Sequence, residues 1–183
     1  MESAPSLHTT MSHPPEVWLR GPVPHVPPLL QPAAHGLLQC LEEVRGAVPT
    51  LTDAELRARP GGVASIAYHV VHAVGSLDRL YAYARGEQLS AAQLAALAAE
   101  PRVNDAPTDG AELAARFADA VERAIAQLRE TPADALTAPR EVGRARLPST
   151  VIGLLFHAAE HTQRHVGQVA TTARVVRGLE AGA

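Results

Sequence analysis

Apolar side chains recur every three or four residues along four long stretches of this 183-residue chain. Such spacing lines one face of an α-helix, so it predicts amphipathic helices over residues 29–47, 63–85, 109–130 and 149–177. The composition, with 46% apolar but only 3% aromatic residues, favours packed helices over sheets. The sequence therefore predicts an all-α fold of the four-helix-bundle class.

A proline-rich arm precedes the first predicted helix. Residues 1–28 contain seven prolines, which break any regular helix, so an irregular arm is expected there. Trp18 and Leu19 are the side chains expected to dock this arm onto the body. The remainder of the chain, residues 29–183, is long enough for one core and is expected to be a single four-helix-bundle domain.

Short extra elements are expected between the long helices. Thr52 to Glu55 and Ser90 to Gln93 have the spacing of a capping box, in which two side chains satisfy the free amides at a helix start. Each pair predicts the start of a short helix. Residues 132–147 are expected to form a loop or a weak hairpin, and Pro148 to Ser149 to open the last helix.

Charge and cysteine content narrow the class of protein. The net charge is −3 and the pI is near 6.3, without a basic run, so no nucleic-acid partner is expected. The single cysteine, Cys40, excludes an internal disulfide framework and fits a reducing cytoplasm. No apolar stretch reaches the roughly 18–20 residues of a membrane span, and no signal peptide is recognised. We therefore expect a cytoplasmic protein without a membrane partner.

Three of the nine histidines follow one face of the last predicted helix. His157, His161 and His165 are spaced four residues apart, so all three point to the same side. Two imidazoles one turn apart can reach one transition-metal ion. The outer pair lies about 12 Å apart along the axis, so one ion cannot bind all three rings. One of the three must therefore lie outside the ligand set.

The second predicted helix offers a further ligand. His69 and His72 are three residues apart, at the edge of a polar strip that includes Ser76 and Arg79. Polar strips on both helices border the apolar faces, so we expect the two helices to enclose a polar pocket. Three histidines plus water make an open metal site of the catalytic type. The remaining histidines are expected to be solvated; they are His8, His13, His25 and His35.

Two segments resemble the DinB/YfiT-like superfamily of metalloenzymes. They are SIAYHVVHAVGSLDRLYAYARG (65–86) and LPSTVIGLLFHAAEHTQRHVGQV (147–169). The second contains the H-x3-H-x-G-Q pattern from His161 to Gln168. The resemblance implies a four-helix bundle, often a homodimer, with a divalent metal, usually zinc or nickel, between the second and fourth helices. The ligands it implies are His72, His161 and His165, with His69 in reserve for His72.

The resemblance also implies a function. Relatives with an assigned activity transfer low-molecular-weight thiols such as bacillithiol, mycothiol or glutathione, or act as isomerases in thiol-dependent pathways. We therefore expect a metal-dependent transfer of such a thiol cosubstrate to a small electrophile. A metal-dependent hydrolase is an alternative, although no general-base carboxylate accompanies the histidines and one would have to come from the first or third helix. The second alternative is a non-catalytic helical bundle that binds metal as part of a stress response.

Several further side chains are candidates for supporting roles. Ser76 and Arg79 are candidates for contacting a carboxylate on the substrate or thiol; the alternatives are a surface ion pair for Arg79 and a helix-packing role for Ser76. Gln168 is a candidate hydrogen-bond partner for the second nitrogen of a ligand histidine, and His157 is another candidate for a supporting role beside the metal. Glu160 and Arg164 have the spacing of a structural ion pair. Cys40 is interpreted as a small buried apolar residue, and no catalytic residue is assigned.

Overall fold

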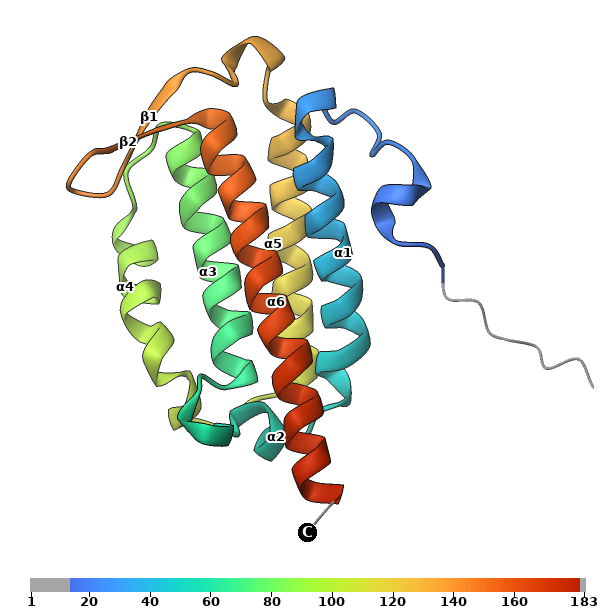
Figure 1. Cartoon of the computed structure of the whole chain (residues 1–183). Helices are drawn as coiled ribbons and strands as arrows, with labels where there is room; N and C mark the ends of the chain where they lie inside the picture. Colours follow the sequence, from blue (N-terminus) through green and yellow to red (C-terminus); the bar gives the residue numbers. More distant parts are fainter. Residues whose placement is uncertain (1–13, 182–183) are drawn as a thin grey trace, which may run out of the picture.

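The computed structural model describes residues 14–181 and confirms the predicted all-helical class (Figure 1). Four long helices form a bundle, and two short helices and a two-stranded ribbon lie in the connections. The helices are α1 Gln31–Ala47, α2 Asp53–Arg57, α3 Ile66–Ala84, α4 Ala91–Ala99, α5 Gly110–Glu130 and α6 Val151–Ala181. The strands are β1 Pro139–Val142 and β2 Leu147–Thr150.

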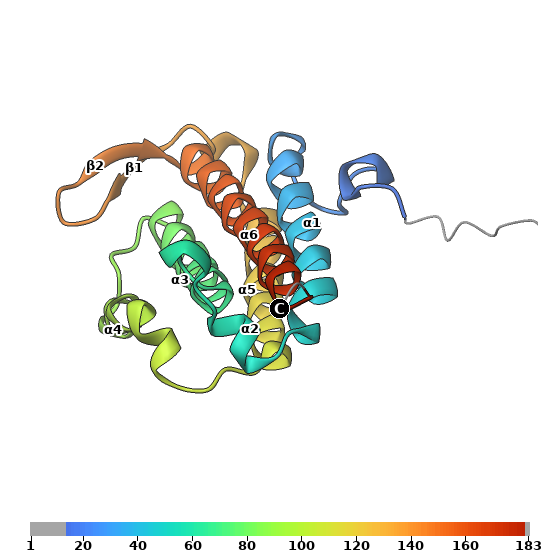
Figure 2. The same ribbon diagram turned by 60° about the horizontal axis from the view of Figure 1, so that its bottom comes forward.

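The four long helices pack as a square. Both α3 and α1 contact α6 on one side and α5 on the other. Figure 1 shows that α1 and α6 run in one direction and α3 and α5 in the opposite one. Because α3 and α5 are parallel, the chain must return along the bundle between them. It does so through α4, which descends along the outside of α3 (Figures 1 and 2).

Side-chain caps start the helices where the sequence predicts. Both capping boxes are present, Thr52 with Glu55 at α2 and Ser90 with Gln93 at α4. Ser65 accepts a hydrogen bond from the Tyr68 amide, so α3 begins at residue 66 rather than at 63. These local bonds fix the helix starts before any packing is considered.

The connection between α5 and α6 contains a short antiparallel hairpin, one of the two forms predicted for residues 132–147. Strand β1 pairs with β2, with Pro139 opposite Thr150 and Val142 opposite Leu147. Gly143 and Arg146 have positive φ angles of 67° and 52° in the turn between the strands. Since β2 extends to residue 150, α6 begins at 151, two residues later than predicted.

The arm docks through a different residue from those predicted. Val17 is buried, whereas Trp18 and Leu19 are 60% and 57% exposed, so the prediction for these two was wrong. In the 3₁₀ turn over Val17–Arg20, Val17 is the buried side chain, and Arg20 forms an ion pair with Glu42 of α1. The Gln31 side chain then fixes the next stretch by bonding to the backbone of Val23 and Val26. His8 and His13 lie outside the described residues.

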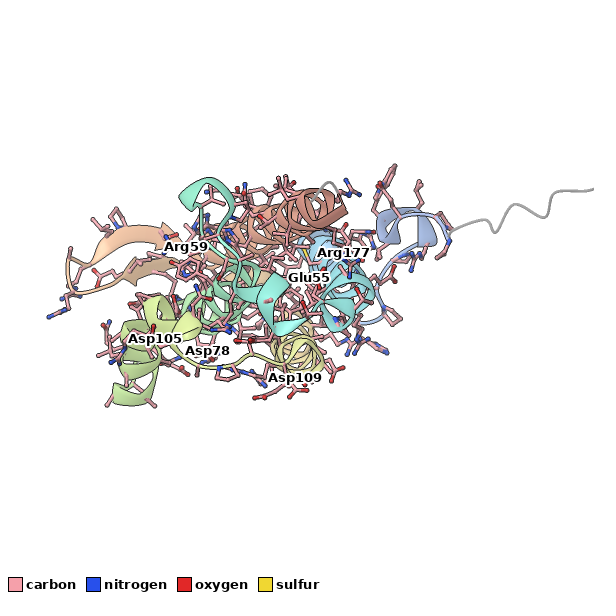
Figure 3. The ribbon with its side chains drawn as sticks, turned by 90° about the horizontal axis from the view of Figure 1, so that it is seen from below. Glu55, Arg59, Asp78, Asp105, Asp109 and Arg177 are labelled. Atoms are coloured by element: carbon pink, nitrogen blue, oxygen red, sulfur yellow. The ribbon has the colours of Figure 1, made fainter. Side chains whose placement is uncertain are left out.

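The buried apolar side chains form one continuous core across the bundle, and an ion pair lies at one end of this core. Its largest fully buried side chains include Leu37, Ile66, Phe117, Leu128 and Leu155. Figure 3 shows the end of the bundle where Arg177 of α6 lies beside Glu55 of α2, with Nε 3.0 Å from Oε1. Within residues 14–181, no helix has the length and hydropathy that crossing a membrane requires.

Replacing Gly110 by alanine should destabilise the bundle. A Cβ at this position, the first residue of α5, would lie 2.3 Å from the carbonyl oxygen of Val48. Because this oxygen belongs to the backbone, it cannot move away as the end of a flexible side chain could. We expect a loss of about 1–3 kcal/mol in the free energy of unfolding, measured by urea titration with circular dichroism. Gly46→Ala in α1 is the matched control, because nothing lies within 4 Å of its Cβ. It should gain about 0.5–1 kcal/mol, and equal effects of the two changes would contradict the packing account.

Candidate metal centre

The histidines of α3 and α6 meet along the seam between these two helices. α3 and α6 run antiparallel and pack together closely. One turn of α3 supplies His69 and His72, and one turn of α6 supplies His161 and His165. Histidines of the second and fourth long helices therefore face each other, as the prediction of a polar site between them requires.

His72, His161 and His165 form a compact cluster. One nitrogen from each ring lies within 4.8 Å of the other two. The Nε2 atoms of His72 and His161 are 3.1 Å apart, and the centroid of the His165 ring lies 4.6 Å and 4.5 Å from theirs. All three rings are half-buried, and Tyr68 stacks on His72 with an interplanar angle of 9°. The structure thus brings together the three residues predicted as ligands.

His69 contacts the cluster but is not one of its three members. Its side chain is buried, and its Nδ1 is 2.9 Å from Nδ1 of His165. One of these nitrogens must carry the proton and donate it to the other. If His165 donates, its Nε2 keeps a free lone pair for a metal. His69 is then a hydrogen-bond partner of a candidate ligand, and the nitrogen in the cluster comes from His72.

Two further candidates on α6 lie outside the three-histidine cluster, although the ring centroid of His157 is 5.6 Å from that of His161. His157 is exposed, and its Nδ1 is 3.3 Å from a carboxylate oxygen of Glu160. Glu160 also pairs with Arg164, as predicted for a structural ion pair. Gln168 is exposed, and its side chain makes no hydrogen bond to any of the described residues. Neither His157 nor Gln168 holds the second nitrogen of a candidate ligand.

Arg79 and Ser76 lie inside the protein rather than on the rim of a pocket. Nη1 of Arg79 is 2.6 Å from Oε1 of Glu100, and both side chains are at least nine-tenths buried. The guanidinium charge is therefore already paired and is not free for a substrate carboxylate. Ser76 is buried on the same helix. Their positions fit the alternatives, an ion pair for Arg79 and a packing role for Ser76, rather than contact with a substrate; the pair of Arg79 is buried and not on the surface.

The partner of His72 was missed by the sequence reasoning. Glu100 follows α4 and is 4% exposed, and its Oε2 is 2.7 Å from Nδ1 of His72. A carboxylate does accompany the histidines, but it comes from the connection between α3 and α5 and not from the first or third long helix. The one sequence signal was its isolation: no other charged residue lies between Glu87 and Pro101.

The other singled-out residues take structural positions. His25 is exposed as expected, whereas Nε2 of His35 bonds to the carbonyl oxygen of Gly21 and helps to hold the arm. Cys40 is buried, and burial raises the pKa of its thiol to about 12. A thiol that stays protonated at neutral pH is not a nucleophile, so the interpretation of Cys40 as a packing residue is confirmed.

Burial lowers the pKa of three of the four imidazoles at this seam, those of His69, His161 and His165. It is the main cause that lowers the pKa of His165 to about 4, with the neighbouring His72 and His161 adding to the effect. Burial, and then His72, also lowers the pKa of His161 and His69. A metal ligand must be unprotonated, so these shifts favour binding at neutral pH.

The donor set fits a transition-metal ion of the zinc or nickel type. Imidazole nitrogens suit such ions, and three of them leave one position open for another ligand. The second nitrogens of His72 and His165 are taken by Glu100 and His69, which is the arrangement that orients ligand histidines in metal sites.

Comparison with known proteins identifies the family. The model of the DinB superfamily matches residues 36–169, and the chain belongs to this superfamily. A solved structure, the conserved protein of locus from Enterococcus faecalis, is similar in fold with a TM-score of 0.66. It is 18% identical in sequence, and the match covers 81% of this chain and 97% of that one. A search of curated proteins gave no match.

Alanine substitutions should separate the three clustered histidines from the other two. His72→Ala, His161→Ala and His165→Ala are each expected to abolish stoichiometric metal, measured by elemental analysis of protein purified without a histidine tag. His157→Ala removes an exposed imidazole from the same helix and should retain full metal. His69→Ala should weaken binding without abolishing it, since it leaves the three nitrogens in place. Metal retained in the His72 variant and lost in the His69 variant would reverse the assignment.

The metal-free protein should lose stability as the pH falls from about 6.5 to 4. In the unfolded chain a histidine takes up a proton near pH 6.5, whereas His165 in the folded protein resists protonation down to about 4. Within this window the unfolded state binds more protons, so lower pH favours unfolding. Chemical denaturation in the presence of a chelator measures this. His165→Gln should flatten the slope, and an unchanged slope would refute the role of this residue.

Proposed function

We propose that this protein is a metal-dependent enzyme that transfers a low-molecular-weight thiol to an electrophilic carbon of a small molecule. The observation that carries the proposal is the cluster of His72, His161 and His165 on facing helices. Membership of the DinB superfamily supports it, because the resemblance of the two helical segments implies thiol transfer in that family.

The charge of the ligand set suits a thiol. Three imidazoles contribute no charge, so an ion held on them would retain its full positive charge toward the fourth ligand. A zinc or nickel ion there would supply a Lewis acid that lowers the pKa of a thiol and favours the thiolate. The chain's own part is to hold the three rings together at half-buried positions, where burial lowers the pKa of His161 and His165.

The surroundings favour thiol transfer over hydrolysis. A hydrolase needs a base beside the attacking water. Glu100 is the carboxylate that touches the cluster, but its two oxygens are engaged by His72 and Arg79 behind the rings. A small-molecule substrate and a homodimer are further predictions that rest on the family resemblance. The non-catalytic alternative predicts tight metal binding without turnover.

Turnover should depend on the three histidines. We expect purified protein loaded with zinc or nickel to join a low-molecular-weight thiol to a bimane-type electrophile, followed by mass spectrometry of the product. Bacillithiol, mycothiol and glutathione would be compared as thiols. His161→Ala should abolish the reaction, and His157→Ala should leave it unchanged. Tight metal binding with no turnover of any thiol would reject the enzyme in favour of the metal-binding bundle.

A further inference from the structure

Glu100 makes two short contacts from a buried position. Its Oε2 is 2.7 Å from Nδ1 of His72, and its Oε1 is 2.6 Å from Nη1 of Arg79. Only 4% of its surface is exposed. A buried carboxylate is costly unless it is paired and hydrogen-bonded, and here each oxygen has one partner.

These contacts select one tautomer of His72. An ionised carboxylate accepts hydrogen bonds and cannot donate them, so Nδ1 of His72 must carry the proton. Its Nε2 is then left with a free lone pair. This nitrogen is the one that lies 3.1 Å from Nε2 of His161, inside the cluster. Glu100 thus prepares the nitrogen that a metal would use.

Helix α3 leaves space for this carboxylate. A Cβ at Gly75 would lie 2.4 Å from Oε1 of Glu100 and 2.7 Å from Nη1 of Arg79. Glycine in a helix interior costs about 1 kcal/mol relative to alanine, so a packing reason is expected for it. Positions 72, 75 and 79 lie on one face of α3, and together they make a slot for the Glu100 side chain.

The return of the chain along α3 delivers Glu100 to this slot. None of the residues of α4 is buried, so the helix adds little to the core. Pro101 follows directly, and the 3₁₀ segment Glu100–Asp105 is fastened to the start of α3 by a hydrogen bond from Ser65 to Asn104. The buried side chain that the turn at the end of α4 presents to α3 is Glu100.

We propose that Glu100 is a positioning residue that fixes the tautomer and orientation of His72 and thereby raises the affinity of the cluster for metal. Only the effect on metal affinity rests on the proposed function; the effect on the tautomer of His72 does not. A purely structural ion pair between Glu100 and Arg79 makes a different prediction: its loss would lower stability and leave the His72 tautomer and metal affinity unchanged.

The first test uses metal-free protein. Long-range ¹H–¹⁵N correlation spectra report which ring nitrogen of a histidine carries the proton, and the signals of His72 are assigned by comparison with His72→Ala. We expect a single Nδ1–H form in the wild type and a mixture in Glu100→Leu. Gly75→Ala, which changes no polar group, should produce the same mixture by displacing the carboxylate. Gly167→Ala on α6, with nothing within 4 Å of its Cβ, is the matched control and should keep the wild-type form.

The second test measures affinity for zinc alone, by competition with a chromophoric chelator. Glu100→Leu should weaken binding by about 10- to 100-fold, and Glu100→Gln, whose amide oxygen can still accept from Nδ1, by less. Glu160→Gln removes an exposed carboxylate near His161 without touching a clustered ring, so it should change affinity less than twofold. Circular dichroism confirms folding of each variant.

The outcomes separate the two proposals. If the wild type binds no zinc but the tautomer changes in Glu100→Leu, the metal-dependent function fails and the positioning of His72 by Glu100 stands. If folded Glu100→Leu keeps both the wild-type tautomer and the wild-type zinc affinity, the positioning role is overturned and the pair with Arg79 is structural.

Discussion

The antiparallel packing of α3 against α6 is the contact on which the candidate centre depends. Each helix buries apolar side chains on the face turned toward the bundle and carries histidines at the margin of that face. Burial of the apolar faces is the dominant favourable term in the free energy of folding. This burial brings the imidazoles together, although contacts between the imidazoles themselves add little to stability. The resulting half-burial has a chemical effect, because it lowers the pKa of His161 and His165 and so favours the neutral imidazole that binds metal.

Local rules were enough to predict the helices. Helical periodicity gave the four long segments, and the capping residues Thr52 and Ser90 gave the short ones, because these signals act within a few residues of the chain. The docking of the arm was predicted wrongly. Which of Val17, Trp18 and Leu19 faces α1 depends on the phase of a short 3₁₀ turn, and local hydrophobicity does not determine that phase.

The candidate site was predicted in part, for a related reason. Residue spacing showed that His161 and His165 share one face of a helix, and the family resemblance selected His72 over His69. Both choices concern positions on regular helices, where spacing determines direction. Glu100 was missed because its contact with His72 depends on α4 running back along α3. That path follows from the parallel arrangement of α3 and α5, which no local pattern encodes.

The distance along the chain between the clustered histidines has a thermodynamic consequence. His72 and His161 are separated by 89 residues, so a bound ion would act as a reversible cross-link that closes a loop of about half the chain. Closing so long a loop removes much of the freedom of the unfolded chain, and a ligand that binds only the folded state stabilises it by mass action. The resistance of this protein to thermal unfolding would then rise and fall with the free concentration of the ion in its surroundings.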